Sequence, residues 1–181
     1  MLDLKILKIQ KGLVKKNNPI KRFRFLHQQN NKIMGSNLFH FLVITEKNSD
    51  FIGDNIIDVH KIFDTHDENR LEIGTVLNRE ENSIEEINLN LLKDNHNYIE
   101  IMSSSNLQEL MTIATIKLNE NSEDLFYLDM VEYYGVVKQL QALKIDNWDC
   151  EISHEKKSIR LTAETDNLFF EYYLILRTNA Q

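Results

Sequence analysis

The stretch that runs from Trp148 to Leu176 reads WDCEISHEKKSIRLTAETDNLFFEYYLIL. Apolar and polar side chains alternate over 148–153 and again over 158–164. A period of two is typical of strands with one buried face. Polar turn-forming residues separate these runs from a third one that begins at Leu168. We therefore expect a three-stranded antiparallel meander, one face of which must be covered by a helix.

Two helices are expected just before this meander. Apolar residues at helical spacing predict the first from Leu107 to Leu118, with Ser105 and Gln108 as a capping box at its start. A longer helix is predicted from 122 to 143, because Ser122 can cap it and acidic residues follow in its first turn. The meander is expected to pack on this long helix.

Shorter elements are expected in the rest of the chain. Alternating or β-branched and aromatic residues predict strands over 2–6, 20–26, 38–45, 71–77 and 98–101. Helical spacing predicts a helix over 54–63, and Ser83 with Glu86 resembles a capping box before a segment that fits either a helix or a strand. The predicted fold is one globular α+β domain over residues 1–181. It has a β-rich N-terminal part, central helices and a C-terminal meander.

The cysteine content and hydropathy pattern indicate a cytoplasmic protein. Cys150 is the only cysteine, so no disulfide forms within the chain, and its place among apolar strand residues indicates a small buried side chain. Polar residues interrupt every apolar run, so neither a signal peptide nor a membrane span is expected. Glycine-rich phosphate loops are missing from the sequence, and we expect no cofactor.

Charge is distributed unevenly along the chain, whose formal net charge is −7. Residues 1–35 hold nine Lys/Arg against Asp3 alone, which gives +8, and the remaining residues therefore carry −15. Such asymmetry can mark a charged partner surface. It can equally reflect two parts of one fold that neutralise each other.

The acidic part suggests a protein that binds another protein without catalysis. A cytosolic inhibitor of the immunity-protein or antitoxin kind, which masks a basic toxin surface, would use a cluster of carboxylates to speed association. Nucleic acid is not an expected partner, because the acidic body would repel the phosphate backbone. The oligomeric state is left open by the sequence. The predicted partner-binding carboxylates are Asp67, Glu68, Glu80, Glu81, Glu85 and Glu86.

Two alternatives remain open at this point. His60, Asp64 and His66 have side chains that suit zinc or a similar metal, so a metal-dependent enzyme is conceivable. The basic N-terminal stretch could instead bind nucleic acid. If residues 20–26 form a strand, however, Phe23 points away from the neighbouring arginines and belongs to the core.

Overall fold

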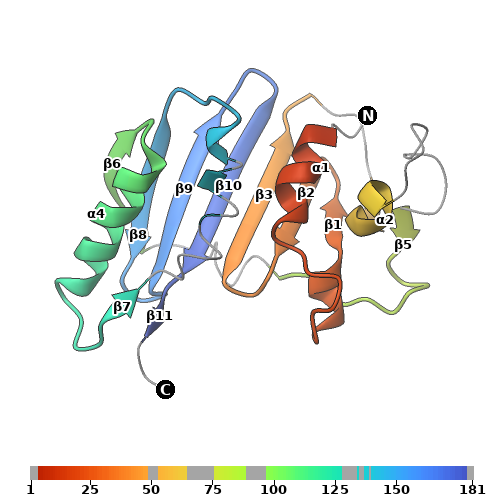
Figure 1. Ribbon diagram of the computed structural model, residues 1–181, viewed down its shortest axis with the longest axis horizontal. Helices are drawn as coiled ribbons and strands as arrows, with labels where there is room; N and C mark the ends of the chain where they lie inside the picture. Colours follow the sequence, from red (N-terminus) through yellow and green to blue (C-terminus); the bar gives the residue numbers. More distant parts are fainter. Residues whose placement is uncertain are drawn as a thin grey trace.

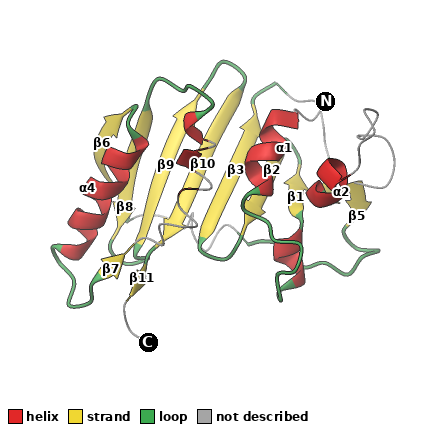
Figure 2. Ribbon diagram, in the orientation of Figure 1, coloured by secondary structure: helices red, strands yellow, loops and turns green. Residues whose placement is uncertain are grey.

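The computed structural model describes residues 4–48, 53–64, 76–88, 97–127, 134, 137–138 and 140–178. Within these residues a nine-stranded antiparallel sheet combines with α-helices, which confirms the α+β class (Figure 1, Figure 2). The strand order is β5-β4-β1-β2-β3-β10-β9-β8-β6. No helix in the described part of the chain is long and apolar enough to cross a membrane.

The C-terminal meander forms as its alternation predicts. Its strands are β8 (Trp148–Ser153), β9 (Ser158–Glu164) and β10 (Leu168–Ile175). β8 pairs with β9 and β9 with β10, and Leu161 lies opposite both Cys150 and Tyr172. β6 (Ile99–Ser104) adds to the free side of β8, so the strand expected near residue 99 is confirmed.

The first part of the chain builds the other half of the sheet. Its strands are β1 (Leu26–Gln29), β2 (Lys32–Ser36), β3 (His40–Glu46), β4 (Asp54–Ile57) and β5 (Val76–Asn78). β3 then pairs with β10 along seven residue positions, with Leu42 opposite Tyr172. Two distant segments of the chain thus form the middle of one sheet.

Helices cover one face of this sheet. α1 (Leu4–Lys11) lies over β2 and β3, and α4 (Leu107–Asn119) lies over β8 and β6 (Figure 1). Apolar residues of both helices share one core with the inward residues of β3, β8, β9 and β10. Asn106 caps α4 by accepting a hydrogen bond from the Glu109 amide at 3.1 Å. The capping box expected around Ser105 is therefore wrong by one residue.

The strand predicted over 38–45 is confirmed as β3, but two other N-terminal predictions were wrong in type. A strand was predicted over 2–6, but the described residues from Leu4 onward form α1, which buries Ile6, Leu7, Ile9 and Gln10. Those residues lie on one face of a helix with 3.6 residues per turn. Burying that face outweighs the short alternation at Leu2 and Leu4, which had predicted a strand. The strand predicted over 20–26 is also wrong up to residue 25, because β1 begins only at Leu26.

Two more elements changed. A 3₁₀ helix, η1 (Lys21–Arg24), stands where a strand was predicted, and Phe23 alone of its residues is buried. The helix predicted over 54–63 begins only at α2 (Val59–Asp64), because residues 54–57 pair with β1 as strand β4. A strand as short as β4 contains too few residues for its alternation to be recognised in a longer sequence window.

The remaining expectations fall partly on residues outside those described. Residues 84–88 are not helical after Ser83, and most of 71–77 and all of 89–96 are not described. The start of the predicted long helix is instead β7 (Phe126–Tyr127), which pairs with β11 (Arg177–Thr178). Residues 134, 137–138 and 140–141 are helical, and Val137 and Leu140 join the core shared with the meander.

Candidate nucleic-acid interface

Lysine side chains follow the solvent side of α1 and the loop after it. The buried residues of α1 fall on one helical face, so Lys8 and Lys11 project from the other, and Lys15 is exposed in the loop after the helix. Lys16 follows directly, and its side chain is 70% exposed. The three-residue spacing of Lys8 and Lys11 places them on the same side of α1.

α2 adds a fifth lysine to this surface. α2 packs against α1: the His60 ring nitrogen Nε2 lies 3.1 Å from the Val14 carbonyl oxygen, and Lys11 Nζ lies 5.0 Å from the centre of the Phe63 ring. Val59 and Ile62 are buried beneath, and Lys61 is 61% exposed. We call the set of Lys8, Lys11, Lys15, Lys16 and Lys61 the lysine face.

Carboxylates of α2 accompany the lysine face. Asp64 Oδ2 lies 3.2 Å from Lys16 Nζ, and Asp64 Oδ1 lies 4.0 Å from Lys11 Nζ. Asp58 lies 3.9 Å from Lys61. Among the described residues, these two carboxylates of the α2 region offset part of the positive charge of the lysine face.

The next cations along the chain serve the fold instead. Lys21 Nζ donates to the Asn82 carbonyl at 2.8 Å, Arg22 pairs with Glu85 at 2.7 Å, and Arg24 Nε donates to the Asn18 carbonyl at 2.5 Å. Phe23, buried among the core residues Met34 and Tyr173, is not available to stack on a base. The basic N-terminal stretch thus divides into an exposed part and an internal part.

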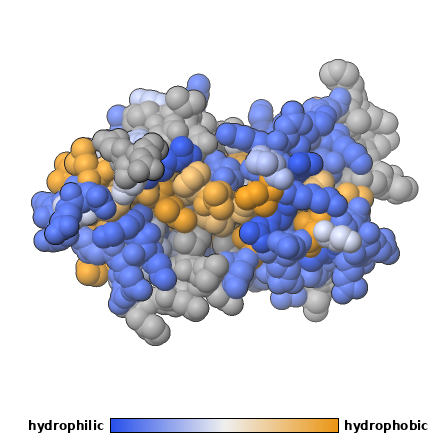
Figure 3. Space-filling view, turned by 90° about the horizontal axis from the view of Figure 1, so that it is seen from below, coloured by the Kyte–Doolittle hydropathy of each residue, from blue (hydrophilic) through white to orange (hydrophobic). Residues whose placement is uncertain are grey.

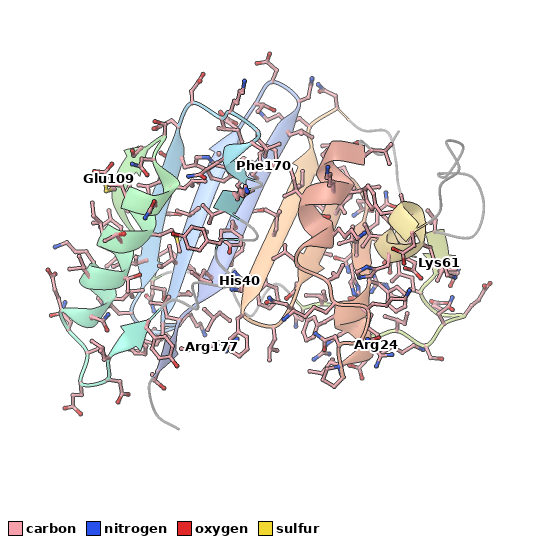
Figure 4. All side chains as sticks on the ribbon, viewed as in Figure 1. Arg24, His40, Lys61, Glu109, Phe170 and Arg177 are labelled. Atoms are coloured by element: carbon pink, nitrogen blue, oxygen red, sulfur yellow. The ribbon has the colours of Figure 1, made fainter. Side chains whose placement is uncertain are left out.

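The far end of the helix-covered face has a different character. Along α4 the exposed charges are Glu109, Lys117 and Glu120, and the last two pair with each other at 3.1 Å. Lys61 and Glu109 lie at opposite ends of the molecule (Figure 4). Seen from below, polar side chains cover most of the end that holds α1 and α2, and a band of apolar side chains crosses the middle (Figure 3).

The opposite face of the meander is acidic and hollowed. A hollow of about 370 Å³ is lined by Glu100, Asp149, Glu151 and Glu171, together with Arg160, Thr162 and Phe169. Arg160 Nε donates to Glu151 at 2.5 Å, and the Tyr173 hydroxyl donates to Glu171 at 2.8 Å. Four carboxylates against one guanidinium give this hollow an excess of negative charge.

The predicted partner-binding carboxylates do not all lie in the described part of the chain. Glu80, Glu81 and Glu86 are exposed in the segment after β5, and Glu85 is engaged with Arg22. Asp67 and Glu68 lie outside the described residues. A partner-binding role for these side chains stays a prediction.

The described residues do not support the metal-binding hypothesis. His60 and Asp64 contact Val14 and two lysines, as described above, and His66 lies outside the described residues. Nowhere in residues 4–48, 53–64, 76–88, 97–127 or 140–178 do three His, Cys, Asp or Glu side chains meet in a way that could hold a metal ion.

Buried polar groups elsewhere are structural. His40 Nδ1 lies 2.5 Å from the Tyr172 hydroxyl in the core, so this buried histidine has a hydrogen-bond partner. Cys150 is fully buried, and burial raises the pKa of its thiol to about 12. A thiol with that pKa is not a nucleophile at neutral pH.

Sequence reasoning missed one buried cluster. His27 Nε2 donates to the Arg22 carbonyl at 2.7 Å, and Arg79 Nη1 donates to His27 Nδ1 at 2.7 Å. Arg79 Nε also donates to Asp54 at 2.8 Å. Burial, followed by the neighbouring Arg79 cation, lowers the pKa of His27 to about 4. His27, Asp54 and Arg79 are far apart in sequence, so no local spacing predicts that they meet.

Known proteins resemble this chain in fold but not in sequence. No protein family and no curated protein matches the chain in sequence. Solved structures match it in fold. The β chain of DNA polymerase III from Streptococcus pneumoniae does so with a TM-score of 0.52 at 10% identity, covering 98% of this chain and 63% of that chain.

Two further structures give similar values. The β subunit of DNA polymerase III from Thermotoga maritima has a TM-score of 0.51 at 13% identity, and the DNA polymerase sliding clamp from Bacillus subtilis has 0.49 at 11%. Each comparison again covers 98% of this chain and 63% of the other. The chain therefore spans less than two thirds of the length of these proteins.

The fold likeness corrects the functional expectations. An immunity-protein or antitoxin-like inhibitor is the wrong prediction, and a basic toxin as partner and the expectation against nucleic acid fail with it. The physical reason is that the net charge of −7 conceals a local run of cations in α1 and the loop after it. Local fields, rather than net charge, decide which surface attracts a charged partner. What the likeness shows for this chain is a DNA-clamp-like fold.

Proposed function

We propose that the protein is a clamp-like accessory of DNA synthesis that lies against duplex DNA through its lysine face. The observation that carries this proposal is the fold likeness to two DNA polymerase III subunits over 98% of the chain. The proposal places the protein in the cytoplasm, as its single cysteine predicts.

The lysine face supplies the contact chemistry. Lysine ammonium groups are compact point charges that neutralise phosphates, and each neutralised phosphate releases condensed counterions. Lys8, Lys15, Lys16 and Lys61 are exposed on the helix-covered side of the sheet. The set lacks the bidentate side chains that read base edges, so the contact is independent of DNA sequence.

The other surfaces support the same orientation. The hollow on the opposite face presents four carboxylates against one guanidinium, and the exposed charges of α4 are two glutamates and one lysine. A duplex that approaches the molecule is therefore drawn to the end that holds α1 and α2. Binding duplex DNA through the lysine face does not require a catalytic group in this protein.

Charge reversal on the lysine face tests the proposal. A chain carrying Lys8→Glu, Lys15→Glu and Lys61→Glu should lose about tenfold or more in duplex affinity at about 50 mM salt, because three phosphate contacts become repulsive. Fluorescence anisotropy with a labelled duplex of random sequence measures this loss. For the unaltered chain, the logarithm of the affinity should fall with the logarithm of salt with a slope of about −3 to −5.

The matched control reverses three lysines outside the lysine face. Lys117→Glu, Lys144→Glu and Lys156→Glu change the net charge equally and should leave most of the affinity in place. Equal losses in both variants would show that only net charge matters, and an unaltered chain without measurable duplex binding at low salt would refute the proposal.

A further inference from the structure

Asp64 lies between two members of the lysine face. One of its carboxylate oxygens is 3.2 Å from Lys16 Nζ and the other is 4.0 Å from Lys11 Nζ. The side chain of Asp64 is 51% exposed, and those of Lys11 and Lys16 are 34% and 70% exposed. One anion thus contacts cations from both the helix α1 and the loop that follows it.

The fold fixes this carboxylate in place. α2 is anchored on α1 by buried Val59 and Ile62 and by the contact between His60 and Val14. Phe63, the residue before Asp64, lies under the Lys11 ammonium. Asp64 is therefore held beside these lysines by packing, not by the ion pairs alone.

Exposed ion pairs of this kind are weak. Water and salt screen them, and each partner is readily exchanged for another ion. A DNA phosphate that reaches Lys11 and Lys16 can therefore replace the carboxylate. The carboxylate itself remains nearby as a negative charge against the phosphate.

We infer that Asp64 restrains the lysine face: it holds Lys11 and Lys16 in the free protein, yields them to phosphate on binding, and so keeps duplex affinity below what the five lysines alone would give. This inference rests on the proposed function. It assigns Asp64 the role of setting how tightly the protein holds the duplex.

The substitution Asp64→Asn tests the inference, because it removes the charge and keeps the shape. Duplex affinity of the full chain at about 50 mM salt should rise about fivefold, and the slope against salt should steepen by about 1, as for one additional phosphate neutralised. The gain should shrink as salt rises, since the contacts are exposed.

Glu109→Gln is the matched control. It makes the same charge change on α4, at the other end of the molecule (Figure 4). Its duplex affinity should match that of the unaltered chain. An equal gain in both variants, or a loss in Asp64→Asn, would overturn the inference, the latter by showing that Asp64 positions the lysines for binding.

A double-mutant cycle shows whether the effect passes through the lysines. In a chain with Lys11→Gln and Lys16→Gln, adding Asp64→Asn should give less than half of its gain in the unaltered background. A gain of equal size in that background would refute the exchange of Lys11 and Lys16 between carboxylate and phosphate.

The same measurements separate failure of the inference from failure of the proposed function. If reversal of Lys8, Lys15 and Lys61 weakens binding by about tenfold or more while Asp64→Asn changes nothing, only the inference fails. If no variant and no salt condition yields duplex binding, the proposed function fails first.

Discussion

At the scale of single residues, the buried cluster around His27 makes stability depend on pH. The imidazole donates from Nε2 to a carbonyl and accepts at Nδ1 from Arg79, so both nitrogens are used only in the neutral form. A proton on Nδ1 would face the Arg79 guanidinium. Burial and this cation account for the lowering of the His27 pKa to about 4.

The sign of the pH effect follows from this pKa. Between the usual value of 6.5 and about 4 the unfolded chain binds a proton that the folded chain excludes, so the stabilisation is complete above pH 6.5 and is lost as the pH falls through this window. The loss is on the order of 3 kcal/mol, at about 1.4 kcal/mol for each pKa unit. Urea denaturation at pH 7, 5.5 and 4.5 measures it.

His27→Gln should flatten this dependence. The glutamine can still donate and accept but does not titrate, so its curve should lose the part of the slope that belongs to residue 27. His154→Gln, in the turn between β8 and β9, provides the control and should retain the slope. A dependence that survives His27→Gln would show that another group is responsible.

At the scale of elements, the start of α4 is decided by one side chain. Asn106, and not Ser105, accepts the hydrogen bond from the Glu109 amide. Asn106→Ala should therefore destabilise the protein by about 1 kcal/mol, the usual effect of removing an N-cap. Ser105→Ala should leave the free energy of unfolding unchanged in the same denaturation experiment, and the reverse order of effects would contradict the assignment.

The elements that could be predicted from the sequence are those with one strong period. The meander over 148–175 and the helix at 107–118 have long apolar patterns, so neighbouring packing only reinforced them. α1 and β4 are short, and their patterns fit both periods. Their type was decided by partners far away in sequence, such as β1 for β4.

The candidate site, too, could be predicted only in part from the sequence. The excess of cations in the first part of the chain was visible in the sequence, but which of them reach solvent was not. Lys21, Arg22 and Arg24 contact Asn82, Glu85 and Asn18, and only the folded chain brings the first two pairs together. The sequence predicts Asp64 as a metal ligand beside His60 and His66, whereas its two lysine partners lie 48 and 53 positions earlier and no local pattern indicates them.

At the scale of the whole molecule, the sheet ends in two edge strands. In the described part of the chain, β5 and β6 each have a strand on one side only. Val76 on β5 is 41% exposed and Ile99 on β6 is 59% exposed. An edge with unpaired backbone groups and an exposed apolar side chain favours pairing with another chain.

We therefore expect the protein to self-associate through these edges. Sedimentation velocity should show a mass that rises with concentration, and Ile99→Lys should shift it toward the monomer, because a lysine on an edge opposes pairing. Ile116→Lys, on the exposed side of α4 at 54% exposure, is the control and should associate like the unaltered chain. A constant monomeric mass would argue against edge pairing.

The pairing of β3 with β10 also has a consequence for biosynthesis. His40 meets Tyr172 across 132 positions, so β3 leaves the ribosome long before the strand that completes it. Until β10 emerges, the flank of β3 that β10 will occupy is open to aggregation, and contacts so distant in sequence close slowly. The nascent chain can therefore complete the middle of its sheet only after β10 has been synthesised.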